Sequence, residues 1–154
     1  MGVYRTAVHD RLDVPARMRL PEGDERAYRL FGRPIPQAIP IRLIIDTGAK
    51  RSSLVPQVLN QLAPTSASRA TDEIGLGMRQ TELYWVRLEF MAGTLAAVPR
   101  LAVARLPLPS SLQEYHGLIG RDLLSKWYSL LYEGRRGQLT IRDSRAGFFS
   151  WFES

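Results

Sequence analysis

The sequence predicts a single all-β domain, and two observations carry that prediction. From about residue 27 onward, short apolar runs are broken by turn residues, which is typical of all-β proteins. The length of 154 residues with 45% hydrophobic residues is enough for one buried core. Residues 1–26 are polar and interrupted by prolines, so we expect residues 1–28 to be a loosely packed N-terminal extension. This segment contains three acidic residues, and we expect them to lie in a solvated loop: Glu22, Asp24 and Glu25.

Three segments carry the strand signal in the first two thirds of the chain. Residues 39–45 are an aliphatic run between prolines and Thr47-Gly48, which predicts a buried strand. Residues 84–90 alternate apolar and polar side chains, which predicts a half-buried strand. Residues 95–106 repeat the β signal, but Pro99 cannot donate a ladder hydrogen bond, so we expect an edge or a bulge there.

The remaining elements are a hairpin and two short helices. Residues 128–132 and 138–142 flank a glycine-containing turn and predict a β-hairpin. Residues 56–62 place apolar side chains on one helical face behind an initial proline, which predicts a helix. Residues 122–127 predict a second helix, in which Asp122 suits the first turn as a cap.

The composition excludes several classes of function. The chain has no cysteine, so disulfides, thiol nucleophiles and Cys-based zinc sites are excluded. His9 and His116 lack metal-ligand or triad spacing, so we expect no metal and no cofactor. No apolar stretch approaches the roughly 18 residues of a membrane span, and the first residues lack a signal-peptide core, so we expect a cytoplasmic protein without a membrane partner. The net charge of +6 is spread along the chain, which favours a solvated surface over a nucleic-acid partner.

The segment with recognisable chemistry is Asp46-Thr47-Gly48-Ala49, which directly follows the first predicted strand. A strand that ends in Asp delivers a carboxylate to a cleft on a rigid support. Gly48 permits a close backbone approach, and the small Ala49 leaves room for a substrate main chain. An ordinary turn at a strand end uses the same residue types, so this segment alone leaves a structural role for Asp46 open.

A second segment, Leu118 to Leu124, consists of two aliphatic residues, then Gly120-Arg121-Asp122, then two leucines. The two segments together resemble the paired signatures of the retropepsins, the single-domain aspartic peptidases of retroviruses and many bacteria. The resemblance covers about residues 29–142, which we take as one domain. It implies a closed all-β barrel with one short helix after the second segment.

The resemblance also implies how such a protein works. Two chains would form a two-fold homodimer, and each would supply Asp46, with Thr47 and Gly48, to a shared pair that cleaves a polypeptide through an activated water without cofactor or metal. The segment 74–77 resembles the glycine-rich flap that closes over a peptide. The residues expected to contact the substrate are Ala49, Lys50, Arg51, Ile74, Gly75, Leu76, Gly77 and Leu118.

One departure from the family pattern affects these expectations. Retroviral signatures usually continue with an acidic residue that pairs with the Arg of the second motif, but here that position is Lys50. We therefore expect Lys50 and Arg51 either to favour acidic substrate side chains or to point to solvent or Asp122. The aromatic tail, residues 143–154, is a candidate dimer interface. The alternatives left open are a non-catalytic peptide-binding or assembly module on the same fold and a basic nucleic-acid-binding protein.

Overall fold

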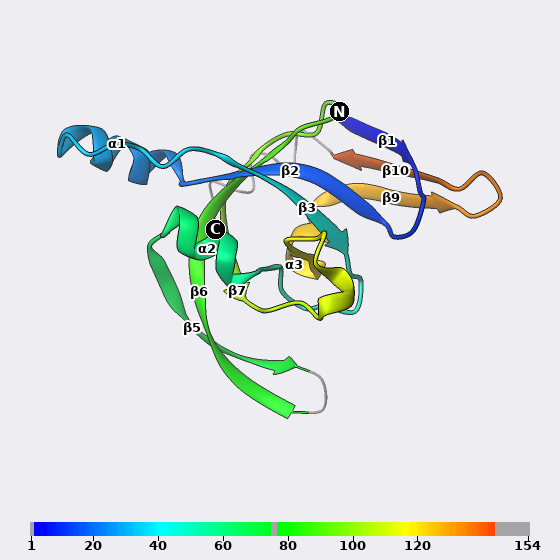
Figure 1. Cartoon of the computed structure of the whole chain (residues 1–154). Helices are drawn as coiled ribbons and strands as arrows, with labels where there is room; N and C mark the ends of the chain where they lie inside the picture. The colour runs from blue at the N-terminus through cyan, green and yellow to red at the C-terminus, as the bar shows by residue number, and fades with distance from the viewer. Residues whose placement is uncertain (1, 75–76, 144–154) are drawn as a thin grey trace.

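The computed structural model describes residues 2–74 and 77–143 (Figure 1). Within these ranges no helix is long and apolar enough to span a bilayer. In chain order the elements are β1 (Val3–Ala7), β2 (Asp13–Arg19), α1 (Glu22–Leu30), β3 (Ile39–Ile45), β4 (Ser53–Leu54), α2 (Pro56–Leu62), β5 (Ser66–Ile74), β6 (Gly77–Phe90), β7 (Val98–Arg105), the 3-10 turn η1 (Ser110–Leu112), β8 (Gly117–Ile119), α3 (Arg121–Leu124), β9 (Trp127–Glu133) and β10 (Gln138–Asp143).

The larger sheet closes into a barrel. Its strand order is β2-β3-β8-β4-β7-β6-β5, and an additional pairing of β2 with β6 closes the ring with β5 outside it. The barrel interior is filled by aliphatic side chains from every wall, including Val14, Leu43, Leu54, Val86 and Ile119. The prediction of an all-β closed barrel is therefore confirmed.

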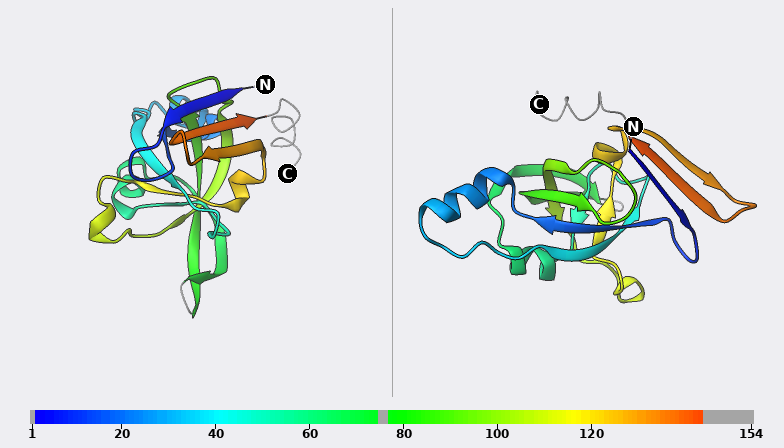
Figure 2. Two further views of the ribbon diagram at one scale, coloured as in Figure 1. Left: turned by 90° about the vertical axis from the view of Figure 1, so that its right-hand side faces the viewer. Right: turned by 90° about the horizontal axis from the view of Figure 1, so that it is seen from above.

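A smaller sheet of three strands, ordered β1-β10-β9, covers one end of the barrel, and α1 lies at the opposite end (Figures 1 and 2). Leu139 and Ile141 of β10 are fully buried and belong to the same core as the barrel. The rings of Trp127 in β9 and Phe90 in β6 lie 5.7 Å apart, centroid to centroid. These contacts make the two sheets one packed unit.

Most elements that the sequence predicts are present. The strand at residues 39–45 and the helix at residues 56–62 have the predicted bounds, and the predicted hairpin is β9 with β10. The helix expected over residues 122–127 is shorter. It ends at Leu124 because Trp127 already begins β9, where it pairs with Asp143.

Pro99 lies where the sequence places an irregularity. The register between β6 and β7 shifts between Val86 and Leu88, which face Leu101 and Val98. Pro99 is therefore in the bulged part of β7, where its missing N–H costs no ladder hydrogen bond. The expected bulge is confirmed.

The expectation of a loosely packed N-terminal extension is wrong. β2 pairs with β3 along one side and with β6 along the other, so it is a wall of the barrel. Its alternate residues Val14, Ala16 and Met18 are almost completely buried. β1 pairs with β10 in the smaller sheet. The first strand thus begins at Val3, well before residue 27.

The acidic group is not a solvated loop either, because it forms the first turn of α1. Carboxylates are favoured there by the exposed N–H groups of the helix start. The Glu25 side chain is only 3% exposed and lies 2.9 Å from Arg87 of β6 and 3.2 Å from Arg19 of β2. Glu25 therefore attaches the helix to two strands of the barrel.

Replacing Glu25 by Ala should destabilise the fold by about 3 kcal/mol, the lower end of the range for breaking a buried ion pair, because the arginines keep some contact with water. Glu22→Ala is the matched control. Glu22 pairs with Arg26 at 3.7 Å on the solvent side of the same helix, so its loss should cost less than about 0.5 kcal/mol. Urea unfolding midpoints compare the two, and equal losses would contradict the anchoring role of Glu25.

Candidate active site

The carboxylate of Asp46 is carried by the end of β3. Leu43 and Ile45 point into the core, so strand alternation places Ile44 and Asp46 on the opposite face. The Asp46 N–H donates to Ile119 O at 2.9 Å, which extends the pairing of β3 with β8 to the last residue before the turn. Asp46 is half-buried. The strand thus delivers this carboxylate to the outer face of the barrel wall.

The turn after Asp46 is closed by its own hydrogen bonds. The Ala49 N–H donates to Asp46 O at 3.2 Å, and the Gly48 N–H donates to Asp46 Oδ1 at 3.0 Å. The second bond fixes one carboxylate oxygen and leaves Oδ2 unconstrained by it. Thr47 and Gly48 are exposed, so the turn lies at the surface of this single chain.

The second motif supports this turn from behind. The Arg121 N–H donates to Ala49 O at 2.8 Å, and the Asp122 N–H donates to Lys50 O at 3.2 Å. A Cβ atom on Gly120 would lie 2.6 Å from the carbonyl carbon of Arg51, so only glycine allows this approach. The two motifs predicted from sequence are therefore in direct backbone contact.

A serine that sequence reasoning missed completes the support. Ser52 is 2% exposed, and its Oγ donates to Asp122 Oδ1 at 2.7 Å and accepts the Gly120 N–H at 3.0 Å. The Ser52 N–H also donates to the Asp122 carboxylate at 3.0 Å. Nothing in the local sequence distinguishes Ser52 from the adjacent Ser53.

The predicted cap role of Asp122 changes accordingly. The residue before α3 is Gly120, and it makes no side-chain cap bond. The Asp122 carboxylate accepts the N–H of its neighbour Leu123 at 2.8 Å in the first turn, and otherwise binds Ser52. Asp122 therefore links α3 to the loop after Asp46 instead of only capping its helix.

The structure brings together some of the expected substrate residues. Ala49, Lys50 and Arg51 follow Asp46 in the supported loop, where Lys50 is exposed and Arg51 is half-buried with an interaction partner. Leu118 is half-buried on β8 and pairs with Ile44, on the same face as Asp46.

Two of the expected flap residues, Ile74 and Gly77, lie at the ends of adjacent strands. β5 and β6 form a long antiparallel hairpin in which Ile74 pairs with Gly77. The hairpin projects from the barrel in Figure 1. Gly75 and Leu76 lie outside the described residues, and so does most of the aromatic tail at residues 144–154.

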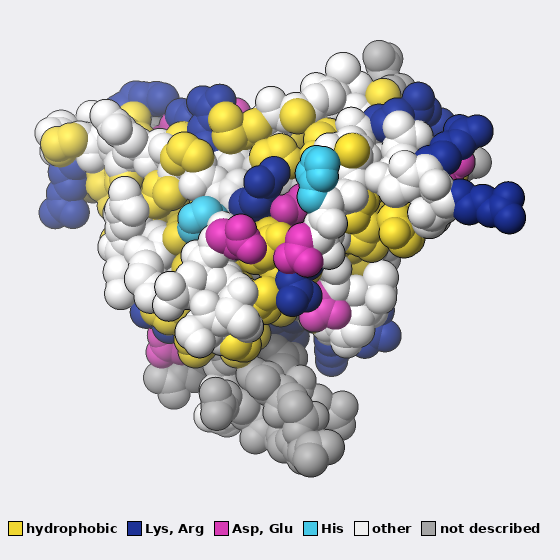
Figure 3. Space-filling model, turned by 45° about the vertical axis from the view of Figure 1, so that its right-hand side comes forward, with side chains coloured by type: hydrophobic (Ala, Val, Ile, Leu, Met, Phe, Trp, Pro, Cys, Tyr) yellow, Lys and Arg dark blue, Asp and Glu magenta, His cyan; other side chains and the backbone are white. Residues whose placement is uncertain are grey.

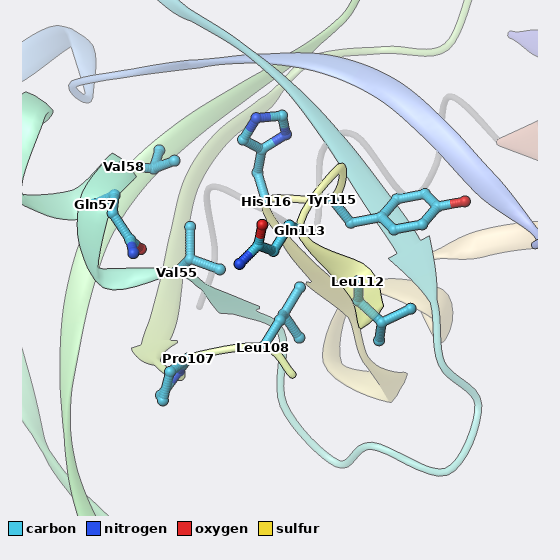
Figure 4. Close-up of a pocket in the computed structure, with 9 residues that line it drawn as sticks. All are labelled: Val55, Gln57, Val58, Pro107, Leu108, Leu112, Gln113, Tyr115 and His116. Carbon is cyan, nitrogen blue, oxygen red and sulfur yellow. The ribbon is translucent and has the colours of Figure 1, made fainter. Parts of the chain in front are cut away.

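A pocket of about 320 Å³ lies between α2, the residues that follow β7 and the residues that precede β8 (Figure 4). It is lined by Val55, Gln57, Val58, Pro107, Leu108, Leu112, Gln113, Tyr115 and His116. His116 Nδ1 accepts the Arg42 N–H at 2.9 Å, so the neutral ring carries its proton on Nε2. Burial lowers the pKa of His116, and burial with nearby acidic residues, Asp13 first, raises the pKa of Tyr115.

The charges on this side of the molecule are mixed. Figure 3 shows acidic and basic side chains interspersed with hydrophobic ones on the face it displays. Asp13 lies 3.2 Å from Arg42, and Asp10 lies 4.0 Å from Arg11. Within residues 2–74 and 77–143, no group of three or more His, Asp or Glu side chains is placed to hold a metal ion.

Comparisons with known proteins support the fold assignment. No protein-family model matches the sequence, and no curated protein matches it. Among solved structures, the chain is similar to a retropepsin-like aspartic protease from Rickettsia conorii, with a TM-score of 0.56 and 12% sequence identity over 91% of this chain and 89% of that chain. At this identity the similarity establishes the fold. The expected retropepsin-like barrel is thereby confirmed.

Proposed function

We propose that the chain is one subunit of a homodimeric aspartic endopeptidase. The observation that carries this proposal is the Asp46 turn, in which a half-buried carboxylate ends a barrel strand and is supported by the second motif through Arg121 and Asp122. The fold is that of a retropepsin-like protease, in agreement with the two motifs. The fold alone would not support a peptidase activity, because a fold does not determine an activity. The proposal therefore also depends on the Asp46 turn and the two motifs.

The chemistry requires two carboxylates about 3 Å apart that share one proton, because two like charges so close cannot both ionise easily. The ionised member accepts a proton from water as the water attacks the scissile carbonyl. The protonated member donates to the carbonyl oxygen. The pair titrates as a unit.

The second carboxylate is proposed to be Asp46 of another copy of the chain. Within the two motifs the other acidic residue is Asp122, and its carboxylate is already hydrogen-bonded to Ser52. A two-fold axis beside Asp46 brings two identical turns together and makes the cleft self-complementary.

A polypeptide would bind this cleft in an extended conformation. Its main chain would pair beneath the β5–β6 hairpins of both subunits, and alternate side chains would enter apolar pockets. Leu118, with Ile44 beside it on the Asp46 face, is suited to line such a pocket. The end of the β5–β6 hairpin, at Ile74 and Gly77, would act as the flap, because a two-stranded projection can move without disturbing the barrel.

Activity should depend on protein concentration, because one chain supplies only half of the catalytic pair. We expect the specific activity towards a peptide library to fall as the protein is diluted below its dimer dissociation constant, in parallel with the dimer fraction from sedimentation. A peptide-binding module on the same fold would bind the library without cleaving it at any concentration. Full activity in a fraction that sediments as monomer would contradict the shared site.

A further inference from the structure

Lys50 directly follows the turn that begins at Asp46, so the distance between these two residues is limited by the chain. The Ala49 N–H to Asp46 O bond closes a four-residue turn, which keeps the Cα atoms of Asp46 and Ala49 within about 7 Å. One more residue adds about 3.8 Å, so the Lys50 Cα is within about 11 Å of the Asp46 Cα. An extended peptide advances about 3.3 Å per residue. The flexible Lys50 stem can therefore reach substrate side chains about three residues from the scissile bond.

The structure holds the Lys50 backbone and leaves its side chain available. Its carbonyl accepts the Asp122 N–H at 3.2 Å, and Asp122 is itself held by Ser52. The Lys50 side chain is exposed. It forms no ion pair with any residue in the described ranges 2–74 and 77–143. A fixed backbone that presents an exposed, unpaired cation beside a substrate cleft is suited to recognise an anionic group.

The charges around this loop favour that use of Lys50. Arg121 is exposed, and its N–H contacts the adjacent Ala49, so it adds a second cation. The carboxylate of Asp122 already accepts hydrogen bonds from the N–H of Ser52, the hydroxyl of Ser52 and the N–H of Leu123. Arg51 is half-buried and has an interaction partner, so the inference does not depend on it.

We propose that Lys50 makes the enzyme prefer polypeptides with Asp or Glu about three residues from the scissile bond. This inference rests on the proposed peptidase function and adds a substrate class to it. In a two-fold dimer Lys50 occurs on both sides of the cleft, so the preference applies on both sides of the cleaved bond. An exposed ion pair of this kind corresponds to about a two- to fivefold gain in kcat/KM for each position.

Matched peptides test this proposal. Each carries Glu, Gln or Lys at the third residue on one side of a common cleavable bond, and kcat/KM is measured with the full-length wild type and with Lys50→Glu. The wild type should cleave the Glu peptide about two- to fivefold faster than the Gln peptide, and Lys50→Glu should favour the Lys peptide. The preference should weaken at 1 M salt, where the screening length falls to about 3 Å.

Arg135→Glu is the control, since it makes the same charge change in the exposed β9–β10 turn and should keep the wild-type preference. If Lys50→Glu does not fold, Lys50→Gln should still remove the preference without reversing it. Cleavage without any preference for Glu, or a Glu preference that survives replacement of Lys50, would overturn this inference and leave the peptidase proposal intact. Failure of the wild type to cleave any peptide would overturn the peptidase proposal itself.

Discussion

Replacing Asp46 by Asn should lower the rate of peptide cleavage by about 10²- to 10⁴-fold or more while fold and self-association stay unchanged. Asn has nearly the shape of Asp, and its amide oxygen can still accept the Gly48 N–H that closes the turn at 3.0 Å. Asn cannot ionise or share a proton, so the pair loses both its base and its acid function. The measurements are kcat/KM on a cleavable peptide, the thermal midpoint and the sedimentation coefficient.

Mixing experiments make this prediction sharper. If each site uses Asp46 from two chains, adding Asp46→Asn protein to a fixed amount of wild type should lower activity, because mixed dimers hold one competent carboxylate. Asp10→Asn is a suitable control for added protein, since Asp10 is exposed and forms only a surface ion pair with Arg11 at 4.0 Å. Cleavage at the wild-type rate by Asp46→Asn would end the hypothesis that Asp46 catalyses the hydrolysis.

The parts of the fold that sequence predicted correctly are those with local signals. The aliphatic run at residues 39–45 and the proline-initiated helix at residues 56–62 each carry their own periodicity and boundaries. The bulge at Pro99 follows from the chemistry of one residue. These predictions required no knowledge of distant contacts.

The N-terminal errors have a different origin. The alternation of Val14, Ala16 and Met18 is a strand signal, but the proline and the arginine between them obscured it. The burial of Glu25 depends on Arg87, which is 62 residues away in sequence. An acidic residue in a polar segment shows no local sign of such a partner, so composition alone assigned it to solvent.

In the candidate site, too, residues within local motifs were predicted and a residue with a distant partner was not. Asp46 and Gly120 were identified because their neighbours form recognisable motifs, whereas Ser52 was missed because its partner Asp122 is 70 residues away. The second motif nevertheless indicated that another backbone segment packs closely against Gly120. Gly120 is required where two backbones nearly touch, and the second of those backbones is the loop that carries Ser52.

Gly120→Ala should therefore destabilise the protein by about 3 kcal/mol or more and abolish activity. The added Cβ would meet three backbone atoms of Arg51, at 2.6, 2.8 and 2.9 Å, and no rotamer change can relieve a clash with backbone. Relief requires that α3 move away from the loop after Asp46. The hydrogen bonds of Ala49 with Arg121 and of Ser52 with Asp122 would then be lost together.

The matched control is Gly134→Ala, because a Cβ on Gly134 meets nothing within 4 Å and its φ is not positive. Its effect on the free energy of unfolding should stay within about 0.5 kcal/mol. Urea unfolding and peptide cleavage are measured on both variants. If Gly120→Ala unfolds at the wild-type midpoint and keeps full activity, the close contact between the two motifs does not hold the Asp46 turn. If it is destabilised yet fully active under native conditions, the contact supports the fold but does not position the carboxylate.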